Sequence, residues 1–483
     1  MKKYWFLIFI LTVSLSCSQS KPNEAAKPNV VIILADDMGI GDVEAYNPDS
    51  KIPTPNMNTL AEEGMRFTNA HSPSSVCTPS RYGLLTGRYP WRVMEGGGAA
   101  GPYSPLLIDT ARITMADLFK KQKYATAATG KWHLGLGNED SINYFAELKP
   151  GPLELGFDYF FGMAASLNMS PHCFIEDYYT VGTPDVPVLD YVFSNHGSLT
   201  MTEGWRHEDV GPTITEKATG WLKKQIENYP DQPFFLYLPT SAPHRPCYPP
   251  DFIKGRSKAG VRGDMVAEVD WTVGEVVKLL KEKGVYENTI LIVSSDNGAI
   301  GGNTPLAPDD SISVDSVFHH EGNSYWRGRK TQIWEGGHRI PMIVKWPGKT
   351  SSGAVSDELV ELIDWYATFA DFFDMKIPEN AGEDSYSLLP VITREESVRD
   401  ALITQSAFGT FAVHTDEWKL ILGQGSGGWG DSREYDYPPG QLYDMQTDSL
   451  ETTNLFEEHP AVVDKLEKIL EDYKASGRSN QQN

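Results

Sequence analysis

The chain has 483 residues, of which 40% are hydrophobic, and this length favours one large domain with a smaller one beside it. A total of 65 Asp and Glu against 42 Lys and Arg gives a net charge of −23, which argues against nucleic-acid binding because that function needs a basic surface. An anionic substrate would need a local cationic pocket in so acidic a protein.

The N-terminus predicts export. Lys2 and Lys3 precede the apolar run 4–16, which is shorter than the roughly 20 residues that a membrane-spanning helix needs. Cys17 follows, so residues 1–17 resemble a bacterial lipoprotein signal, with Cys17 as the lipidated residue and 18–28 as a flexible tether. Ser14 stands where such signals usually carry Leu, which leaves ordinary secretion as the alternative. We expect a location in the periplasm or on the outer-membrane surface.

Four apolar runs without polar alternation predict strands that are buried on both faces. These runs are 29–37, 124–135, 233–246 and 288–298. Helices are predicted over 54–64, 213–228 and 264–283, the last two because each stretch places its apolar residues on one face. In the first of these helices, Thr54 is the expected N-cap, Pro55 the first helical residue and Gly64 the stop signal.

The alternation of strands and helices predicts an α/β fold, a doubly wound, largely parallel mixed sheet flanked by helices. Residues 29–376 would form this domain. After residue 376 the pattern changes: 377–390 is typical of a linker, short β-like runs follow, and Val462, Val463, Leu466, Ile469 and Tyr473 share one face of a final helix. We therefore expect a smaller α+β subdomain over 377–483.

Polar residues follow the predicted strands at the edge where ligands bind in such sheets. Asp36, Asp37, Asp296 and Asn297 offer only oxygen ligands, which suit Ca²⁺ or Mg²⁺ and not Zn²⁺. Asp-Asp and Asp-Asn-Gly are also common in turns, so either pair alone would favour turn chemistry. Because both pairs fall at the same predicted edge, the sequence favours a metal site.

Positive charge for an anionic substrate would come from Lys131, His133, His244 and Lys330. Each of them taken singly is more typical of a surface lysine or a hydrogen-bonded histidine. Arg327 and Arg329 are equally good candidates beside Lys330.

Cysteine is scarce, and Cys77 precedes Pro79 at a predicted helix N-terminus. The helix dipole and Arg81, four residues on, would acidify a free thiol there. The alternative is a small buried residue ahead of a helix. Cys173 and Cys247 either form a disulfide or are two small buried residues.

The sequence Cys77-Thr-Pro79-Ser-Arg81, continued by YGLLTGRY, resembles the Cys-x-Pro-x-Arg signature of the formylglycine-dependent sulfatases. Further segments that carry the resemblance are ILADDMGIGD, TGKWHLG, SAPHRP, VSSDNG and RGRKTQIWEGGHRIP. The resemblance runs through nearly the whole chain from Asn29 and implies the alkaline-phosphatase-like fold. It also implies that a maturation enzyme oxidises Cys77 to Cα-formylglycine (3-oxoalanine), so that the thiol never acts as such.

The resemblance assigns a role to each motif residue. Asp36, Asp37, Asp296, Asn297 and the modified Cys77 match the calcium ligands, and Mg²⁺ is the alternative ion. Arg81 matches the residue that stabilises the formylglycine hydrate. Lys131 and Lys330 match the lysines that hold sulfate. His244 lies where the leaving-group oxygen is expected, and His133 where the formylglycine hydroxyl is expected.

A mechanism follows from these roles. One hydroxyl of the hydrated aldehyde, acidified by the metal and deprotonated by Asp296, attacks sulfur, while Lys131 and Lys330 stabilise the developing charge. His244 or Lys330 protonates the departing alcohol. His133 then takes the proton of the second hydroxyl, which expels sulfate and restores the aldehyde.

The substrate is predicted less specifically. The resemblance points to sulfated glycans, closest to enzymes acting on galactose or N-acetylgalactosamine 6-sulfates, and the candidates for sugar recognition are His172, Glu176 and Trp429. A phosphodiesterase or phosphonate hydrolase of the same superfamily is one alternative. A non-catalytic glycan-binding surface lipoprotein is the other.

Overall fold

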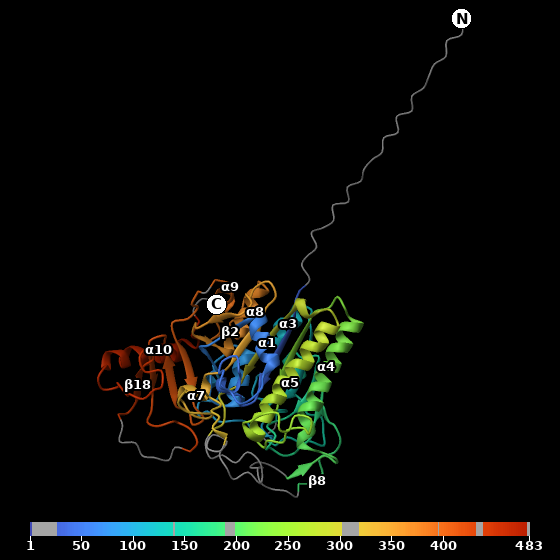
Figure 1. Ribbon diagram of the computed structural model, residues 1–483, viewed down its shortest axis with the longest axis horizontal. Coiled ribbons are helices and arrows are strands. Elements are labelled where there is room, and N and C mark those ends of the chain that lie inside the picture. Colours follow the sequence, from blue (N-terminus) through green and yellow to red (C-terminus); the bar gives the residue numbers. More distant parts are fainter. Residues whose placement is uncertain are drawn as a thin grey trace.

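A mixed sheet, with ten strands among the described residues, forms the centre of the protein in the computed structural model (Figure 1). The structure describes Met1 and residues 27–138, 141–188, 199–301, 318–394, 396–430 and 438–480. From one edge to the other the strands are β13 (Ala354–Ser356), β2 (Met65–Phe67), β12 (Met342–Lys345), β11 (Thr289–Ser295), β1 (Asn29–Ala35), β10 (Phe234–Pro239), β4 (Ala125–Lys131), β5 (Tyr159–Met163), β6 (Ile175–Glu176) and β7 (Tyr179–Thr180).

The central part of this sheet is parallel. Strands β11, β1, β10, β4 and β5 all run in one direction, whereas β12 and β6 pair antiparallel to their neighbours at either side. The four apolar runs of the sequence correspond to β1, β4, β10 and β11, so the prediction of a largely parallel mixed sheet is confirmed.

Helices cover both faces of the sheet (Figure 1). One face carries α1 (Pro55–Glu63), α4 (Val210–Asn228) and α5 (Gly260–Glu282), and the other carries α2 (Cys77–Thr86), α3 (Met115–Lys121) and α8 (Trp365–Phe372). The shorter helices are α7 (Glu335–His338) and α9 (Leu389–Arg394). The three helices predicted over 54–64, 213–228 and 264–283 are therefore confirmed.

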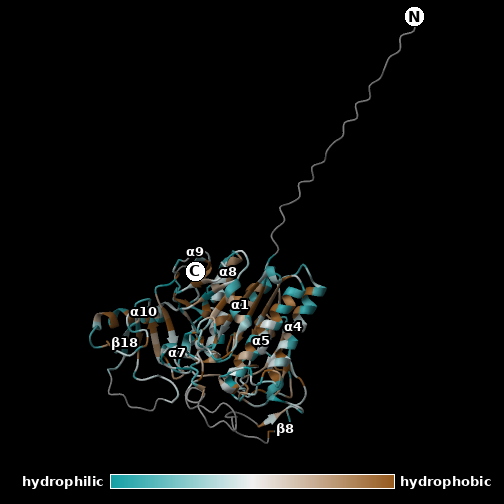
Figure 2. Ribbon diagram, in the orientation of Figure 1, coloured by the Kyte–Doolittle hydropathy of each residue, from teal (hydrophilic) through white to brown (hydrophobic). Residues whose placement is uncertain are grey.

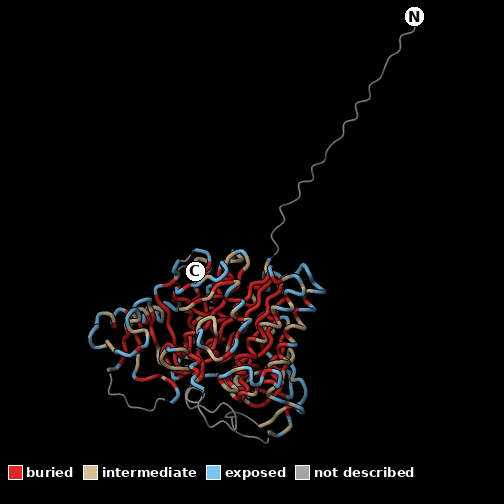
Figure 3. Tube along the Cα trace, viewed as in Figure 1, coloured by how far each residue is buried: buried red, intermediate tan, exposed pale blue. Residues whose placement is uncertain are grey.

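The pleat of β1 explains how one short strand serves two cores. Val30, Ile32 and Leu34 belong to the hydrophobic cluster on the α2 side, and their neighbours Val31, Ile33 and Ala35 belong to the cluster on the α5 side. Every residue of this strand is buried, which is why its sequence shows no polar alternation. Figures 2 and 3 show the same pattern, with hydrophobic and buried residues concentrated between the helices.

A second, antiparallel sheet lies towards the C-terminus, beside the main domain in Figure 1. It comprises β15 (Leu402–Gln405), β16 (Phe411–His414), β17 (Trp418–Ile421) and β18 (Gln441–Asp444), and α10 (Pro460–Ser476) packs on it. On α10 the buried residues are Val463, Leu466 and Leu470, with Val462, Ile469 and Tyr473 packed partly buried around them. Two further strand pairs are β3 (Ala70–His71) with β14 (Val360–Glu361), and β8 (Val186–Pro187) with β9 (Thr200–Met201).

Two local expectations are wrong in part, the capping of α1 by Thr54 and the linker over 377–390. Thr54 is at the N-cap of α1, but its hydroxyl accepts from the Glu44 N–H at 3.0 Å and does not cap the helix. Part of the predicted linker is buried: residues 381–385 pack in the fold, and Asp384 pairs with Arg92 at 2.7 Å. A run of small and polar residues is compatible with such packing when each carboxylate finds a partner.

Among the described residues, no helix is long and apolar enough to cross a membrane. The signal and the tether predicted over residues 1–17 and 18–28, with Cys17, fall almost entirely outside the described residues. Cys173 and Cys247, both described, form no disulfide; their buried thiols face the carbonyl oxygens of Pro171 and Pro243 at 3.9 and 3.7 Å.

Candidate active site

The polar ends of three parallel strands meet at one edge of the main sheet. Asp36 and Asp37 follow β1, Asp296 and Asn297 follow β11, and Lys131 is the last residue of β4. Because β1 pairs in parallel with both β11 and β10, and β10 with β4, these ends lie together. All five side chains are fully buried. The sequence prediction that these residues converge is thus met by the geometry.

Three cationic side chains face the three carboxylates of this cluster. Lys131 Nζ lies 2.8 Å from both oxygens of Asp36, and Lys330 Nζ lies 2.7 Å from Asp37 Oδ2. Arg81 donates to Asp296 Oδ2 through Nε at 3.0 Å and Nη2 at 2.6 Å. Positive and negative charges therefore balance within the buried cluster.

The pKa values follow from burial and these charges. Burial alone would raise the pKa of Asp37, but the charges of Lys330, His244 and Lys131 hold it well below its usual range. The pKa of Asp296 is raised, because burial and the negative charge of Asp36 outweigh Arg81. One carboxylate of the cluster is thus strongly held in its ionised form and another is more easily protonated.

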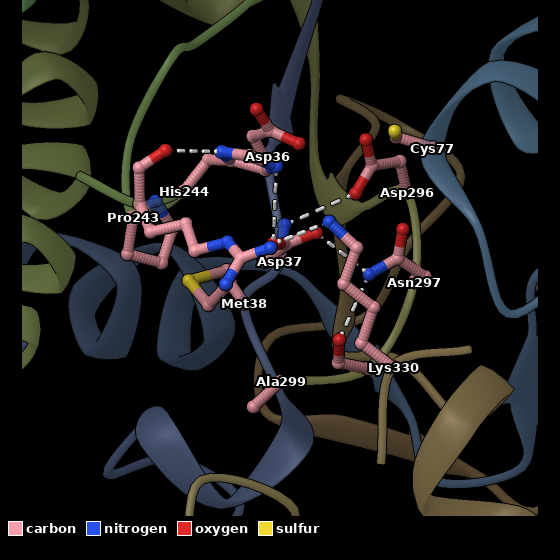
Figure 4. Close-up of polar contacts among 12 residues, drawn as sticks. Asp36, Asp37, Met38, Cys77, Pro243, His244, Asp296, Asn297, Ala299 and Lys330 are labelled. Carbon is pink, nitrogen blue, oxygen red and sulfur yellow. Dashed lines mark hydrogen bonds and ion pairs between the residues drawn. The ribbon is translucent and has the colours of Figure 1, made fainter. Parts of the chain in front are cut away.

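Asn297 indicates that the cluster suits a hard cation. Its Nδ2 donates to Asp37 Oδ1 at 2.9 Å and to the Gly298 carbonyl at 2.8 Å (Figure 4). Its buried Oδ1 has no hydrogen-bond partner among the described residues. An unpaired buried carbonyl oxygen beside three carboxylates is the donor set that Ca²⁺ or Mg²⁺ prefers. A divalent ion would also leave the site positive, as an anionic ester requires.

Cys77 is the first residue of α2, and its thiol faces His133. Cys77 Sγ lies 3.3 Å from His133 Nδ1, and His133 Nε2 lies 2.9 Å from the Ala100 carbonyl oxygen. Since a carbonyl only accepts, Nε2 carries the proton and Nδ1 turns a lone pair towards residue 77. Burial and the charges of Lys131 and Arg81 lower the pKa of His133 well below its ordinary value, which keeps the ring neutral.

The expectation of an acidified thiol at Cys77 is wrong. Burial raises the pKa of the Cys77 thiol above its ordinary value, although Lys131 and Lys330 act in the opposite direction, and the nearby carboxylates Asp36 and Asp296 raise it further. An unmodified cysteine here is therefore a poor nucleophile, in spite of its position at a helix N-terminus.

A cavity of about 100 Å³ lies beside this cluster, and Lys330, which is bonded to Asp37, is part of its lining. Cys77, His133, His244 and Lys330 line it together with Arg245 and Trp429. His244 Nδ1 donates to the carbonyl of Arg245 at 2.6 Å, and His244 Nε2 lies 3.7 Å from Asp37 Oδ2. Burial and Lys330 lower the pKa of His244 well below its ordinary value.

Lys330, and not Arg327 or Arg329, reaches the cluster. Arg327 Nη1 lies 3.2 Å from the hydroxyl of Tyr443, and Arg329 Nη1 donates to the Gly301 carbonyl at 2.6 Å. The sequence alone left these three cations equivalent, because nothing in their spacing shows which side chain turns inward.

Comparison with known proteins identifies the family. The family model described as Sulfatase matches residues 28–375, which is well over half of the chain. The chain belongs to the sulfatase family. Its fold is that of the alkaline-phosphatase-like superfamily, and it is a sulfate ester hydrolase. A second model, the C-terminal region of N-sulphoglucosamine sulphohydrolase, matches residues 324–476.

Several relatives resemble this sulfatase over most of their length. An N-acetylgalactosamine-6-O-sulfatase of Bacteroides thetaiotaomicron is 34% identical over 93% of this chain and 93% of its own. The N-acetylgalactosamine-6-sulfatase of Mus musculus is 30% identical, over 89% of this chain and 78% of its own. A solved structure from work on the metabolism of multiple glycosaminoglycans by Bacteroides thetaiotaomicron has a TM-score of 0.82 and 33% identity, covering 93% of this chain and 100% of that one.

The three residues proposed for sugar recognition lie in different places in this sulfatase. Trp429 lines the cavity, and 48% of its surface is exposed. His172 is buried in a ring cluster with Trp205 and His207. Glu176 lies on β6, where it accepts from the Tyr159 hydroxyl at 2.7 Å and from Lys217 at 2.9 Å. Neither His172 nor Glu176 lines the cavity.

Thr331, next to the cavity lysine, joins three parts of the site. Its N–H donates to the Ser75 carbonyl at 2.8 Å, two residues before Cys77, and its carbonyl accepts from Ala407 at 3.0 Å. Its hydroxyl accepts from the backbone N–H of Trp429 at 3.0 Å. The wall that carries Ala407 and Trp429 comes from the C-terminal sheet region, so both parts of the chain build the cavity.

A second cluster that could hold a metal consists of His71, Glu335 and His338. Lys419 Nζ already lies 3.0 Å from Glu335 Oε1, 2.6 Å from Glu451 Oε1 and 3.1 Å from His338 Nε2. The lysine ammonium therefore supplies the positive charge that a metal would supply, and this cluster is better described as a buried ion-pair network.

Proposed function

We propose that the protein is an exported carbohydrate sulfatase that removes 6-O-sulfate from N-acetylgalactosamine or galactose residues of a glycan. In this proposal a maturation enzyme converts Cys77 to formylglycine, and Asp36, Asp37, Asp296 and Asn297 hold Ca²⁺ or Mg²⁺ beside it. The proposal includes the secretion signal at residues 1–17, with lipid attachment at Cys17 and an outer-surface or periplasmic location.

One observation carries the catalytic part of the proposal. Cys77, His133, His244 and Lys330 line one cavity, Lys330 is also bonded to Asp37 of the acidic cluster, and each of the four comes from a different segment of the chain. The names of two relatives, both N-acetylgalactosamine 6-sulfatases, support the choice of substrate.

When present, the metal ion and formylglycine would supply charge neutralisation and a hydrated aldehyde whose hydroxyl attacks sulfur. The residues of the chain have separate tasks. Lys131 and Lys330 form ion pairs with Asp36 and Asp37 in this structure. If a cation bound these carboxylates instead, both ammonium groups would be free to bind sulfuryl oxygens. Arg81 fixes Asp296 and donates to the Lys131 carbonyl at 2.9 Å, which orients the end of β4.

Proton movement falls to the two histidines and Lys330. His133 Nδ1 accepts a proton from the group at position 77, since its lone pair points there. His244 and Lys330 both line the cavity; Lys330 carries a proton for the leaving oxygen, whereas His244 has one at Nε2 only after its ring becomes charged. The net reaction cleaves the S–O bond, with the proton going to the alcohol and water supplying the oxygen that leaves in sulfate.

The experiment is a sulfate-release assay with purified, matured protein on defined sulfated saccharides, including 6-sulfated and 4-sulfated N-acetylgalactosamine and a phosphate monoester. We expect release from the 6-sulfated sugars in preference to the others. A clear preference for the phosphate ester, or no release from any 6-sulfated galactosaminide, would refute this function.

A further inference from the structure

A second hollow adjoins the catalytic cavity. It measures about 460 Å³ and is lined by Ala99, Ala100, Gly101, Asn168, Met169, Arg245 and Trp429. Five of these residues, Ala99, Asn168, Met169, Arg245 and Trp429, also line the cavity that contains Cys77. The two spaces therefore adjoin along these five residues, and a substrate longer than one sugar that is held at Cys77 would extend towards the outer hollow.

Among the described residues that line the outer hollow, Arg245 is the one that carries a charge. Its guanidinium forms no hydrogen bond and no ion pair with any residue that the structure describes; it faces the Trp429 ring, 5.9 Å from the ring centroid, and the charge of Asp37 acts on it at longer range. The other arginines at the heart of the fold differ in this respect: Arg81 is bonded to Asp296, and Arg399 to Glu361.

The position of Arg245 ties it to the reaction centre. It follows His244 directly, and its own carbonyl receives the His244 Nδ1–H bond. The side chain is half-buried, and burial lowers the pKa of the guanidinium from its ordinary value while leaving it charged. A partly desolvated cation that forms no ion pair binds an oxyanion with a more favourable free energy than a fully exposed arginine does.

Trp429 provides a flat apolar surface in the same lining. Its backbone is held at both ends, by Thr331 Oγ1 at 3.0 Å and by Gln332 Nε2 at 3.2 Å, while nearly half of the residue stays exposed. Such a fixed aromatic face suits the C–H face of a sugar ring. The hollow thus combines a surface for a ring with a cation for a charged substituent.

We propose that Arg245 and Trp429 form a second subsite, which binds an oxyanion on the sugar next to the one that is desulfated. This proposal rests on the proposed carbohydrate sulfatase function. The oxyanion is a carboxylate or a sulfate, and the enzyme accordingly prefers acidic oligosaccharides to neutral ones of the same length.

The test uses binding, because binding does not require turnover. Three disaccharides that share N-acetylgalactosamine are titrated by calorimetry, with a neutral hexose, a hexuronate or a sulfated hexose as the neighbour. We expect the wild-type protein to bind at least one acidic disaccharide about 10- to 100-fold more tightly than the neutral one, as a charge-assisted bidentate contact allows. The acidic disaccharide that binds more tightly shows whether the subsite binds a carboxylate or a sulfate.

The variants separate charge from packing. Arg245→Gln should remove the preference for the acidic disaccharide, and Arg245→Lys should keep part of it. Arg394→Gln is the matched control, because this arginine is on α9 with 64% of its side chain exposed, and it should bind all three sugars as the wild type does. Thermal melting checks that each variant is folded.

Equal affinity of the wild type for neutral and acidic disaccharides would overturn the subsite, and so would an undiminished preference in folded Arg245→Gln. The sulfate-release assay is independent of this result. A protein that shows the Arg245-dependent preference but releases no sulfate would refute the proposed function and leave the subsite standing.

Discussion

His133 presents its unprotonated Nδ1 to the sulfur of Cys77 at 3.3 Å, because its Nε2 proton is bound to the Ala100 carbonyl. A ring fixed in this way can take a proton from residue 77 without rotating. His133 has a φ of 57°, an unusual conformation for a residue other than glycine, which shows that the fold holds the ring in place against a backbone cost.

We predict that His133→Gly lowers kcat by about 10²- to 10⁴-fold, the range for losing a general base. Glycine accepts the positive φ, so the substitution removes the ring without adding backbone strain. Added imidazole should restore part of the rate. His319→Gly is the matched control, since His319 is exposed and has a φ of 49°. Unchanged kcat in His133→Gly would remove the base assignment.

Replacing Cys77 by Ser should abolish activity in protein made with a cysteine-specific maturation enzyme. The serine would stay unmodified, and a single hydroxyl offers no second one for release of sulfate. Mass spectrometry of the peptide containing residue 77 and the rate of sulfate release are the measurements. Cys173→Ala, at a buried thiol outside the cavity, is the control. Wild-type turnover by Cys77→Ser would exclude the aldehyde mechanism.

Substrates with different leaving groups can show whether Lys330 or His244 is the general acid. If the residue that protonates the departing oxygen is replaced by Ala, kcat on a sugar sulfate should fall by about 10²- to 10³-fold. The fall in kcat should be about tenfold smaller on a nitrophenyl sulfate, because its phenolate leaves without needing a proton. Lys254→Ala, at an exposed lysine paired with Asp251, is the control. If neither variant depends on the leaving group, neither residue is the acid.

The metal site can be tested without turnover. In chelator-treated protein, Asn297→Leu should weaken Ca²⁺ binding by about 10- to 100-fold, because Leu keeps the shape of the side chain but lacks Oδ1. Calorimetry and the Ca²⁺-dependent rise in Tm measure the loss. Asn228→Leu, at the exposed end of α4, should bind Ca²⁺ as the wild type does. Stabilisation by Zn²⁺ alone would contradict an all-oxygen site.

The buried network around Glu335 predicts how stability depends on pH. Burial lowers the pKa of His71 to about 3, and burial with Lys419 lowers those of His338 and His414 well below the ordinary value of 6.5. Between these values and 6.5 the unfolded chain binds more protons than the folded one. The free energy of unfolding should therefore fall as the pH drops below about 6.5.

His414→Gln should reduce this slope by up to about 1.4 kcal/mol per pH unit, the value for one proton. Gln can keep the contact that His414 Nε2 makes with Thr404 Oγ1 at 3.0 Å. Denaturant unfolding between pH 7.5 and 4.5 provides the measurement. His459→Gln, at an exposed histidine, should leave the slope unchanged. Identical slopes for His414→Gln and the wild type would contradict the assignment.

Much of the fold and of the acidic cluster could be predicted from the sequence. Strands such as β1, buried on both faces, leave an uninterrupted apolar run, and in a parallel sheet their polar ends must share one edge. The short strands β13 and β2, the last two at one side of the sheet, have only three residues each and leave no comparable pattern.

Other features depend on contacts between distant segments. Arg245 gave no signal, because only the folded chain shows that its guanidinium has no hydrogen-bond or ion-pair partner among the described residues. The Glu176 carboxylate could have bound a sugar hydroxyl, but in the folded chain it accepts hydrogen bonds from Tyr159 and Lys217. The pKa of Cys77 could not be read from its helix position, because burial outweighs the dipole there.

The three bonds of Thr331 have a consequence for enzyme engineering. They join the segment before Cys77, the turn at Ala407 and the loop of Trp429, next to the lysine of the cavity. A chimera that imports the C-terminal sheet of a relative in order to change substrate choice would also disturb the alignment of Lys330. Such a graft should keep a hydroxyl side chain at residue 331, so that the turnover rate is maintained when the substrate specificity changes.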